Sequence, residues 1–282
     1  TIRDASYYLS DRPKVEYIVE NIVAEKSINL WYGQWGSKKT WSAIDLGVCV
    51  AIGKAWLGMQ VKQNTVLIID EESGDSRLAD RIKMTMMGES ADAKTPIKSV
   101  SLAQFNLLKQ PSDSVYLLAL IEEVGAKLVI IDALADIMLG GDENSVKDTQ
   151  PVFACLRKIA EVSGASMIVI HHANKLGGYR GSSAIAGAID TMIKIESKQD
   201  SDVITFNTEK MRDGKPANFA GLASWTDTGF YITESDQATK TEYLTKAQQY
   251  TLDFFTDNGD ATLDQLVDHS GNLYAYDTLK KA

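Results

Sequence analysis

The chain has 282 residues, of which 44% are hydrophobic, and it carries a formal net charge of −9. Its length and composition predict one large α/β domain with a small appendage. The acidic balance excludes a globally basic coat for nucleic acid, so any such contact has to be local. Cys49 and Cys155 are too few and too far apart in sequence for a disulfide framework or a metal cluster, which favours a reducing compartment, the cytoplasm. No apolar run is long enough to span a membrane, and no charged-then-apolar leader opens the chain.

Residues 1–27 are polar and mixed, with small apolar patches. We expect this N-terminal lead-in segment to pack on the core or on a neighbouring subunit. The core is predicted to span residues 28–236, and residues 237–282 are predicted to form a small helical region.

An apolar run at residues 28–32 precedes the stretch Gly-Gln-Trp-Gly-Ser-Lys-Lys-Thr at residues 33–40, and a helix that ends at Gly53 is predicted to follow. A strand that enters a glycine turn and opens a helix presents about four unpaired backbone N–H groups at the positive end of the helix dipole, which suits a phosphate. The residues expected to hold a nucleotide are Gly33, Gly36, Ser37, Lys38, Lys39 and Thr40.

In this P-loop interpretation, Lys39 contacts the β- and γ-phosphates of ATP and the Thr40 hydroxyl ligates Mg²⁺. Lys38 stands where the pattern G-x-x-x-x-G-K-[ST] has its second glycine. Its side chain could restrict the loop or crowd the phosphate, or it could act as a second cation that offsets phosphate charge. The alternative interpretation is a strand-to-helix turn with a solvated lysine pair.

The chain then alternates between strand and helix patterns. Strands are predicted at 65–70, 97–102, 127–132 and 166–172, and helices at 76–87, 111–124 and 146–162. Continuous β-branched runs are typical of parallel strands that are buried on both faces. This alternation predicts an α/β fold with a mostly parallel, twisted sheet flanked by helices.

Polar residues stand at the carboxyl ends of these strands, where open α/β sheets bind ligands. Glu71 and Glu72 follow the first strand. Asp132 ends the strand at 127–132 and is a Walker-B candidate that would hold Mg²⁺ through water or orient the attacking water; the alternative is a helix N-cap or a turn aspartate. His171 and His172 end the last strand, and without further ligands at suitable spacing they favour a hydrogen-bonding role over a zinc site.

The loop at 174–183 combines cations, an aromatic residue and glycines, a composition suited to holding a phosphate backbone with one stacking contact. Lys175, Tyr179 and Arg180 are the residues expected to bind single-stranded DNA. The alternative is a solvated, glycine-rich turn.

Three further strands are predicted at 190–196, 202–209 and 225–232. The period-2 alternation of a strand places Lys210 and Arg212 on the same face. From about residue 239 the pattern becomes helical, and the two short helices expected there resemble the start of a winged-helix or helix-turn-helix module.

Taken in order, these motifs resemble those of RecA-like P-loop ATPases, specifically the RepA-like and DnaB-like hexameric replicative helicases. The resemblance covers roughly residues 28–215 and rests on the P-loop and on the stretches at 53–58, 66–72, 128–132, 168–175 and 180–183. It implies that Glu72 is the catalytic glutamate, Asp132 the Walker-B acid and His172 the polar sensor. Lys210 and Arg212 match a Lys-x-Arg that enters the ATP site of the neighbouring subunit as an arginine finger.

The resemblance therefore implies an ATP- and Mg²⁺-dependent ring helicase or single-stranded DNA translocase that acts in DNA replication as a homo-oligomer, a hexamer. Such modules often follow primase or polymerase domains in phages and mobile elements, and a start at Thr1 fits a covalently linked domain of that kind. Two alternatives remain. One is a nucleotide-gated assembly or loading module in which Lys38 has impaired hydrolysis, and the other is a RecA-type strand-exchange recombinase.

Overall fold

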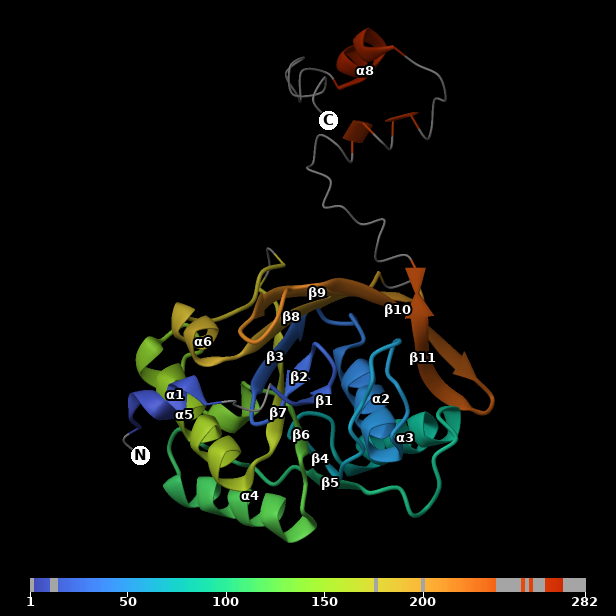
Figure 1. Ribbon diagram of the computed structural model, residues 1–282. Coiled ribbons are helices and arrows are strands. Elements are labelled where there is room, and N and C mark those ends of the chain that lie inside the picture. The colour runs from blue at the N-terminus through green and yellow to red at the C-terminus, as the bar shows by residue number, and fades with distance from the viewer. Residues whose placement is uncertain are drawn as a thin grey trace. The chain divides into compact units, whose positions relative to one another are not determined.

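The computed structural model describes residues 3–10, 15–174, 177–198, 201–236, 250–251, 254–255 and 262–270. The chain divides into two compact units, residues 1–238 and 239–282. Helices and strands of the first unit alternate along most of its length (Figure 1). The elements are α1 (Ala5–Leu9), β1 (Tyr17–Val19), β2 (Val23–Ala24), β3 (Ile28–Gly33), α2 (Lys39–Ile52), β4 (Val66–Asp70), α3 (Asp75–Gly88), β5 (Ile97–Ser101), α4 (Pro111–Val124), β6 (Leu128–Asp132), a 3₁₀ turn (Asp136–Met138), α5 (Val146–Ser163), β7 (Ser166–His172), α6 (Ser183–Ala188), β8 (Thr191–Glu196), β9 (Val203–Met211), β10 (Asn218–Thr226) and β11 (Gly229–Ser235), followed in the second unit by α8 (Leu263–His269).

The first unit is built on one nine-stranded sheet with the order β11-β10-β9-β8-β3-β7-β6-β4-β5. Strands β8, β3, β7, β6, β4 and β5 are parallel, whereas β9, β10 and β11 continue the sheet as antiparallel neighbours. This arrangement confirms the predicted α/β fold with a large, mostly parallel sheet, which is consistent with a RecA-like fold.

Helices cover both faces of the parallel strands, and this explains why their sequences are apolar throughout. On one face, α2 and α3 pack with β1 and β2 over Trp31 and its neighbours. On the other face, α4 and α5 cover alternate residues of β3, namely Ile28, Leu30 and Tyr32. Both layers are visible in Figure 1. The carboxyl ends of β3, β4, β6 and β7 therefore converge at one edge of the sheet, as the sequence interpretation requires.

One strand prediction was wrong. The segment at 225–232 is not a single strand, because it contains the turn between β10 and β11, and β10 itself was missed. The hairpin lies against the end of α3, where two glycines bring the backbones into contact. A Cβ atom on Gly88 would lie 2.1 Å from the Phe230 carbonyl oxygen, and one on Gly229 would lie 2.3 Å from the Met84 carbonyl oxygen.

In the second unit, α8 begins with a capping box in which Thr262 and Gln265 bond each other's backbone N–H groups. Phe254 and Leu266 are buried against each other. Most of the predicted winged-helix region lies outside the described residues. Among the helices that the structure describes, none combines the length and apolarity that crossing a membrane requires.

Candidate nucleotide-binding site

The loop from Gly33 to Lys38 joins the central strand β3 to helix α2. Only glycine fits at position 33, because a Cβ atom there would lie 2.1 Å from the Ile195 carbonyl oxygen. Gly36 and Lys38 both have left-handed backbones, with φ of 75° and 64°. The first N–H groups of α2 therefore open into the loop, as in a phosphate-binding turn.

Lys38 occupies the left-handed N-cap position of α2, which explains why glycine is the usual residue there. Its ammonium group points away from the loop and donates hydrogen bonds to Ser197 Oγ and to the Ser201 carbonyl oxygen, both at 2.8 Å. It also lies 5.7 Å from the ring centre of Trp225. Burial lowers the pKa of the Lys38 ammonium, and Asp202 partly offsets that effect. Lys38 thus ties the loop to the segment between β8 and β9, and its side chain lines the cleft beside Trp225.

Lys39 begins α2 and is buried, and its Nζ donates to the carbonyl oxygens of Gly33 and Gln34 at 3.0 Å each. Burial lowers the pKa of Lys39, while the nearby Asp132 and Glu72 carboxylates raise it. Among the described residues, this ammonium donates hydrogen bonds only to backbone carbonyls of the loop. The side chain is therefore placed to exchange them for phosphate oxygens.

Thr40 and Asp132 are in direct contact, since Thr40 Oγ1 donates to Asp132 Oδ2 at 2.6 Å. Burial raises the pKa of the Asp132 carboxyl to about 6, with Glu72 and Asp70 adding to the shift and Thr40 opposing it. The second oxygen, Asp132 Oδ1, is buried without a hydrogen-bond partner in the described part of the chain. A hydroxyl beside an unpartnered carboxylate oxygen fits Mg²⁺, which prefers hard oxygen ligands.

Glu72 and His172 face each other across the cleft. His172 Nε2 lies 3.8 Å from Glu72 Oε2, and the Glu72 side chain is half exposed. Burial and Lys39 lower the pKa of His172, whereas Glu72 raises it. Glu71 turns the other way and accepts hydrogen bonds from the backbone N–H groups of Gln104 and Phe105. Of the two glutamates after β4, only Glu72 points into the cleft.

These side chains line a cleft of about 430 Å³, together with residues that the sequence interpretation did not select. The additional lining residues are Trp35, Trp41, Arg81 and Trp225. The Trp41 and Trp225 rings are 6.2 Å apart and nearly perpendicular, and Arg81 Cζ lies 6.0 Å from the Trp41 ring. This aromatic and cationic wall offers a stacking surface for a nucleotide base. The only sequence signal for this wall was Trp41, which directly follows the P-loop residue Thr40.

The proposed DNA-binding loop follows β7. Lys175 lies outside the described residues. Tyr179 packs edge-on against Tyr32 with ring centres 6.1 Å apart. Arg180 forms an ion pair with the buried Glu143 at 2.8 Å, although its side chain remains 55% exposed. The loop cation expected to meet phosphate is thus partly neutralised by a carboxylate that is distant in sequence.

Lys210 and Arg212 lie at the far end of β9 and are held within the chain. The Lys210 ammonium donates to the carbonyl oxygens of Ala186 and Ile189. Arg212 Nη1 donates to Asp190 Oδ1 at 2.7 Å, and Arg157 bonds the other oxygen of the same carboxylate. Neither cation lines the cleft of its own chain.

A protein-family model described as "AAA domain" matches residues 3–178, which is more than half of the chain. The matched region contains the P-loop, Glu72, Asp132 and His172, and it ends before Lys210 and Arg212. No curated protein matches the chain.

Proposed function

Because the chain belongs to the AAA domain family, a family of P-loop ATPases with RecA- and DnaB-like helicase-type members, we propose that it is an ATP-driven motor. In this proposal it forms a homo-oligomeric ring, a hexamer, that moves along single-stranded DNA as a replicative helicase. ATP hydrolysis is proposed because five predicted site residues line one cleft: Lys39, Thr40, Glu72, Asp132 and His172.

Several residues of the cleft have distinct tasks in this proposal. Lys39 and the N–H groups of α2 bind the phosphates, and Trp41 and Trp225 seat the base. Thr40 and Asp132 would hold Mg²⁺, which supplies charge neutralisation at the phosphates when bound. Glu72 would accept the proton of the attacking water, and the 3.8 Å between its carboxylate and His172 Nε2 is too long for a hydrogen bond that would occupy it.

Lys38 bears on the alternative of a nucleotide-gated loading module with impaired hydrolysis. Lys38 lines the cleft, but its ammonium is held by hydrogen bonds to Ser197 and Ser201, on the side of the β8–β9 segment. This geometry favours a hydrolytically competent site over an impaired one.

The ring and its shared active sites are supported by the position of Arg212. The cation lies outside its own chain's cleft, and its side chain is 49% exposed despite the bond to Asp190. In our proposal, it reaches the ATP site of the adjacent subunit, where an arginine supplied in trans is worth about 10³ to 10⁵ in rate in other NTPases. Arg212 would have to release Asp190 to do so.

ATP hydrolysis measured with and without single-stranded DNA tests the motor. We expect turnover that DNA stimulates and that Lys39→Ala abolishes. Turnover without any effect of DNA, together with no DNA binding, would refute the translocase while leaving the ATPase intact.

Mixing two inactive variants tests the shared site. Arg212→Ala should bind ATP and hydrolyse it poorly, and adding Lys39→Ala should restore some activity, because one class of interface then combines an intact P-loop with an intact arginine. Mixed rings that form but remain inactive would exclude an arginine acting in trans.

A further inference from the structure

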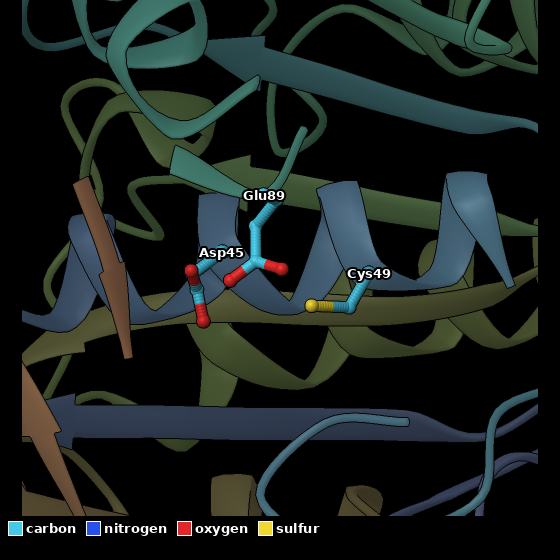
Figure 2. A group of neighbouring side chains, drawn as sticks. All are labelled: Asp45, Cys49 and Glu89. Atoms are coloured by element: carbon cyan, nitrogen blue, oxygen red, sulfur yellow. The ribbon is translucent and has the colours of Figure 1, made fainter. Parts of the chain in front are cut away.

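A second cluster of ionisable side chains lies away from the nucleotide cleft, buried between α2 and the end of α3. It consists of Asp45 and Cys49, one helical turn apart on α2, and Glu89, the residue that follows α3. All three are buried, with 0%, 2% and 5% of their surface exposed. Figure 2 shows the two carboxylates and the thiol gathered in the same small space between the helices.

The geometry points to a binding site for a borderline-soft divalent cation, and we propose that Asp45, Cys49 and Glu89 bind Zn²⁺. One potential ligand atom from each residue lies within 4.8 Å of the other two. Donor atoms around a single tetrahedral zinc ion are roughly 3.5 Å apart, given Zn–S and Zn–O bonds of about 2.3 and 2.1 Å. Side-chain rotations would bring the three donors to this spacing, and a water or a second carboxylate oxygen would fill the fourth position of the tetrahedron.

The hydrogen bonds around Asp45 leave one ligand atom available. Asp45 Oδ2 accepts a hydrogen bond from the Trp56 indole N–H at 2.9 Å. Asp45 Oδ1 is fully buried without a hydrogen bond of normal geometry in the described part of the chain, although the Ile232 backbone N–H lies near enough to the carboxylate to lower its pKa. An unpaired carboxylate oxygen in a dry interior is costly, and a bound cation would satisfy it. The Trp56 N–H would then orient the ligand from outside the coordination shell.

The charges of the cluster also fit a divalent ion. Burial raises the pKa of Asp45 and of the Cys49 thiol, so Zn²⁺ would bind with release of protons. The two carboxylates and the thiolate would then carry three negative charges, which a divalent cation together with the Lys54 ammonium would balance. Lys54 Nζ lies 2.6 Å from Glu89 Oε2, and its side chain is 57% exposed, so it caps the cluster from the solvent side. The thiolate favours Zn²⁺ over Mg²⁺, which prefers oxygen ligands only.

Bound Zn²⁺ would act as a structural clamp between two helices that begin at the nucleotide cleft. Helix α2 starts at Lys39, and α3 starts shortly after Glu72. The prediction that the chain holds no metal cluster rested on the two cysteines alone. It could not anticipate this site, because Glu89 is far in sequence from the α2 pair and the spacing resembles no common zinc motif.

Cobalt titration of the metal-free, reduced 282-residue chain tests the proposal, with excess Mg²⁺ present to occupy the oxygen site at Thr40 and Asp132. We expect one Co²⁺ per chain, a thiolate-to-cobalt charge-transfer band in the near ultraviolet, and displacement of that band by Zn²⁺. Cys49→Ser should abolish the band, whereas the matched variant Cys155→Ser should retain it. Asp45→Asn should weaken binding by about tenfold or more.

Two results would overturn the assignment. The first is a wild-type chain that shows no thiolate band at saturating Co²⁺. The second is a band that persists in Cys49→Ser, since the cobalt would then be bound elsewhere. If Cys49→Ser fails to fold by circular dichroism, the near-isosteric Asp45→Asn decides, because unchanged cobalt affinity in that variant refutes the site.

Discussion

One buried histidine, His171, should cost the fold stability between pH 7.5 and pH 5, against the opposite effect of carboxyls whose pKa is raised, such as Asp132. His171 lies in β7, is fully buried, and bonds the carbonyl oxygen of Arg180 through its ring. Burial lowers the pKa of His171 from 6.5 to about 4, with the Arg180 carbonyl opposing the shift and His172 adding to it. The folded chain therefore favours the neutral imidazole of His171 over the protonated one.

Proton linkage gives the sign and the size of the change in the free energy of unfolding that His171 causes. A histidine with a lower pKa in the folded state stabilises the fold fully above its unfolded pKa and loses that contribution as the pH falls toward the folded pKa. For values of 6.5 and about 4, the loss is about 2 kcal/mol at pH 5 and about 3 kcal/mol once both states are protonated. A change of this size is a large fraction of the stability of an ordinary domain.

Urea unfolding at pH 7.5 and pH 5, followed by circular dichroism, measures the effect. His171→Gln keeps a donor for the Arg180 carbonyl but does not titrate, so its stability should change by about 2 kcal/mol less than that of the wild type over this interval. Equal changes in the two proteins would show that His171 does not carry the pH dependence.

Further predictions concern the cleft and the loop. Glu72→Gln should bind ATP normally and hydrolyse it roughly 10² times more slowly in a steady-state assay, whereas the matched Glu71→Gln should retain turnover; the reverse pattern would move the catalytic role to Glu71. Lys38→Gly should preserve or raise turnover, because glycine adopts φ near 64° without strain, and a dead variant would show that the Lys38 side chain is needed. Trp225→Ala should weaken nucleotide binding in calorimetry by about 1 to 3 kcal/mol if the base stacks there, and unchanged affinity would place the base elsewhere. Arg180→Ala should lower the salt slope of single-stranded DNA binding by less than one unit, since Glu143 already pairs with Arg180; an unchanged slope would remove the residue from the interface.

Much of the fold could be predicted because its strands are specified locally. β6 and β7 are continuous apolar runs that end in polar residues, and such runs are readable without tertiary information. The β10–β11 hairpin could not be read in the same way. Its turn at Asp227 and Thr228 lacks the usual Asn-Gly or Asp-Gly pair at its centre, and Gly221 weakens the strand pattern of β10.

The meeting of Lys39, Thr40 and Asp132 in one cleft could be predicted because these residues occur in patterns tied to strand ends. The aromatic wall could not, because Trp41, Arg81 and Trp225 meet only through the folding of three distant segments. The ion-pair partners of Arg180 and Arg212 could not be predicted either, because they are also distant in sequence. Nothing in the local sequence links Arg180 to Glu143 or Arg212 to Asp190, and both pairs reduce the free positive charge expected at those positions.

The backbone contact between Gly88 and Gly229 gives the cleft a mechanical property. The end of α3 rests on the hairpin that carries Trp225, and the start of α3 follows Glu72, so a displacement at either place is transmitted through a rigid helix. No side chain separates the backbone at Gly88 from that at Gly229, so side-chain rearrangement cannot accommodate a displacement there. Trp225 and Glu72 should therefore shift together, so that a ligand that displaces Trp225 should also displace Glu72.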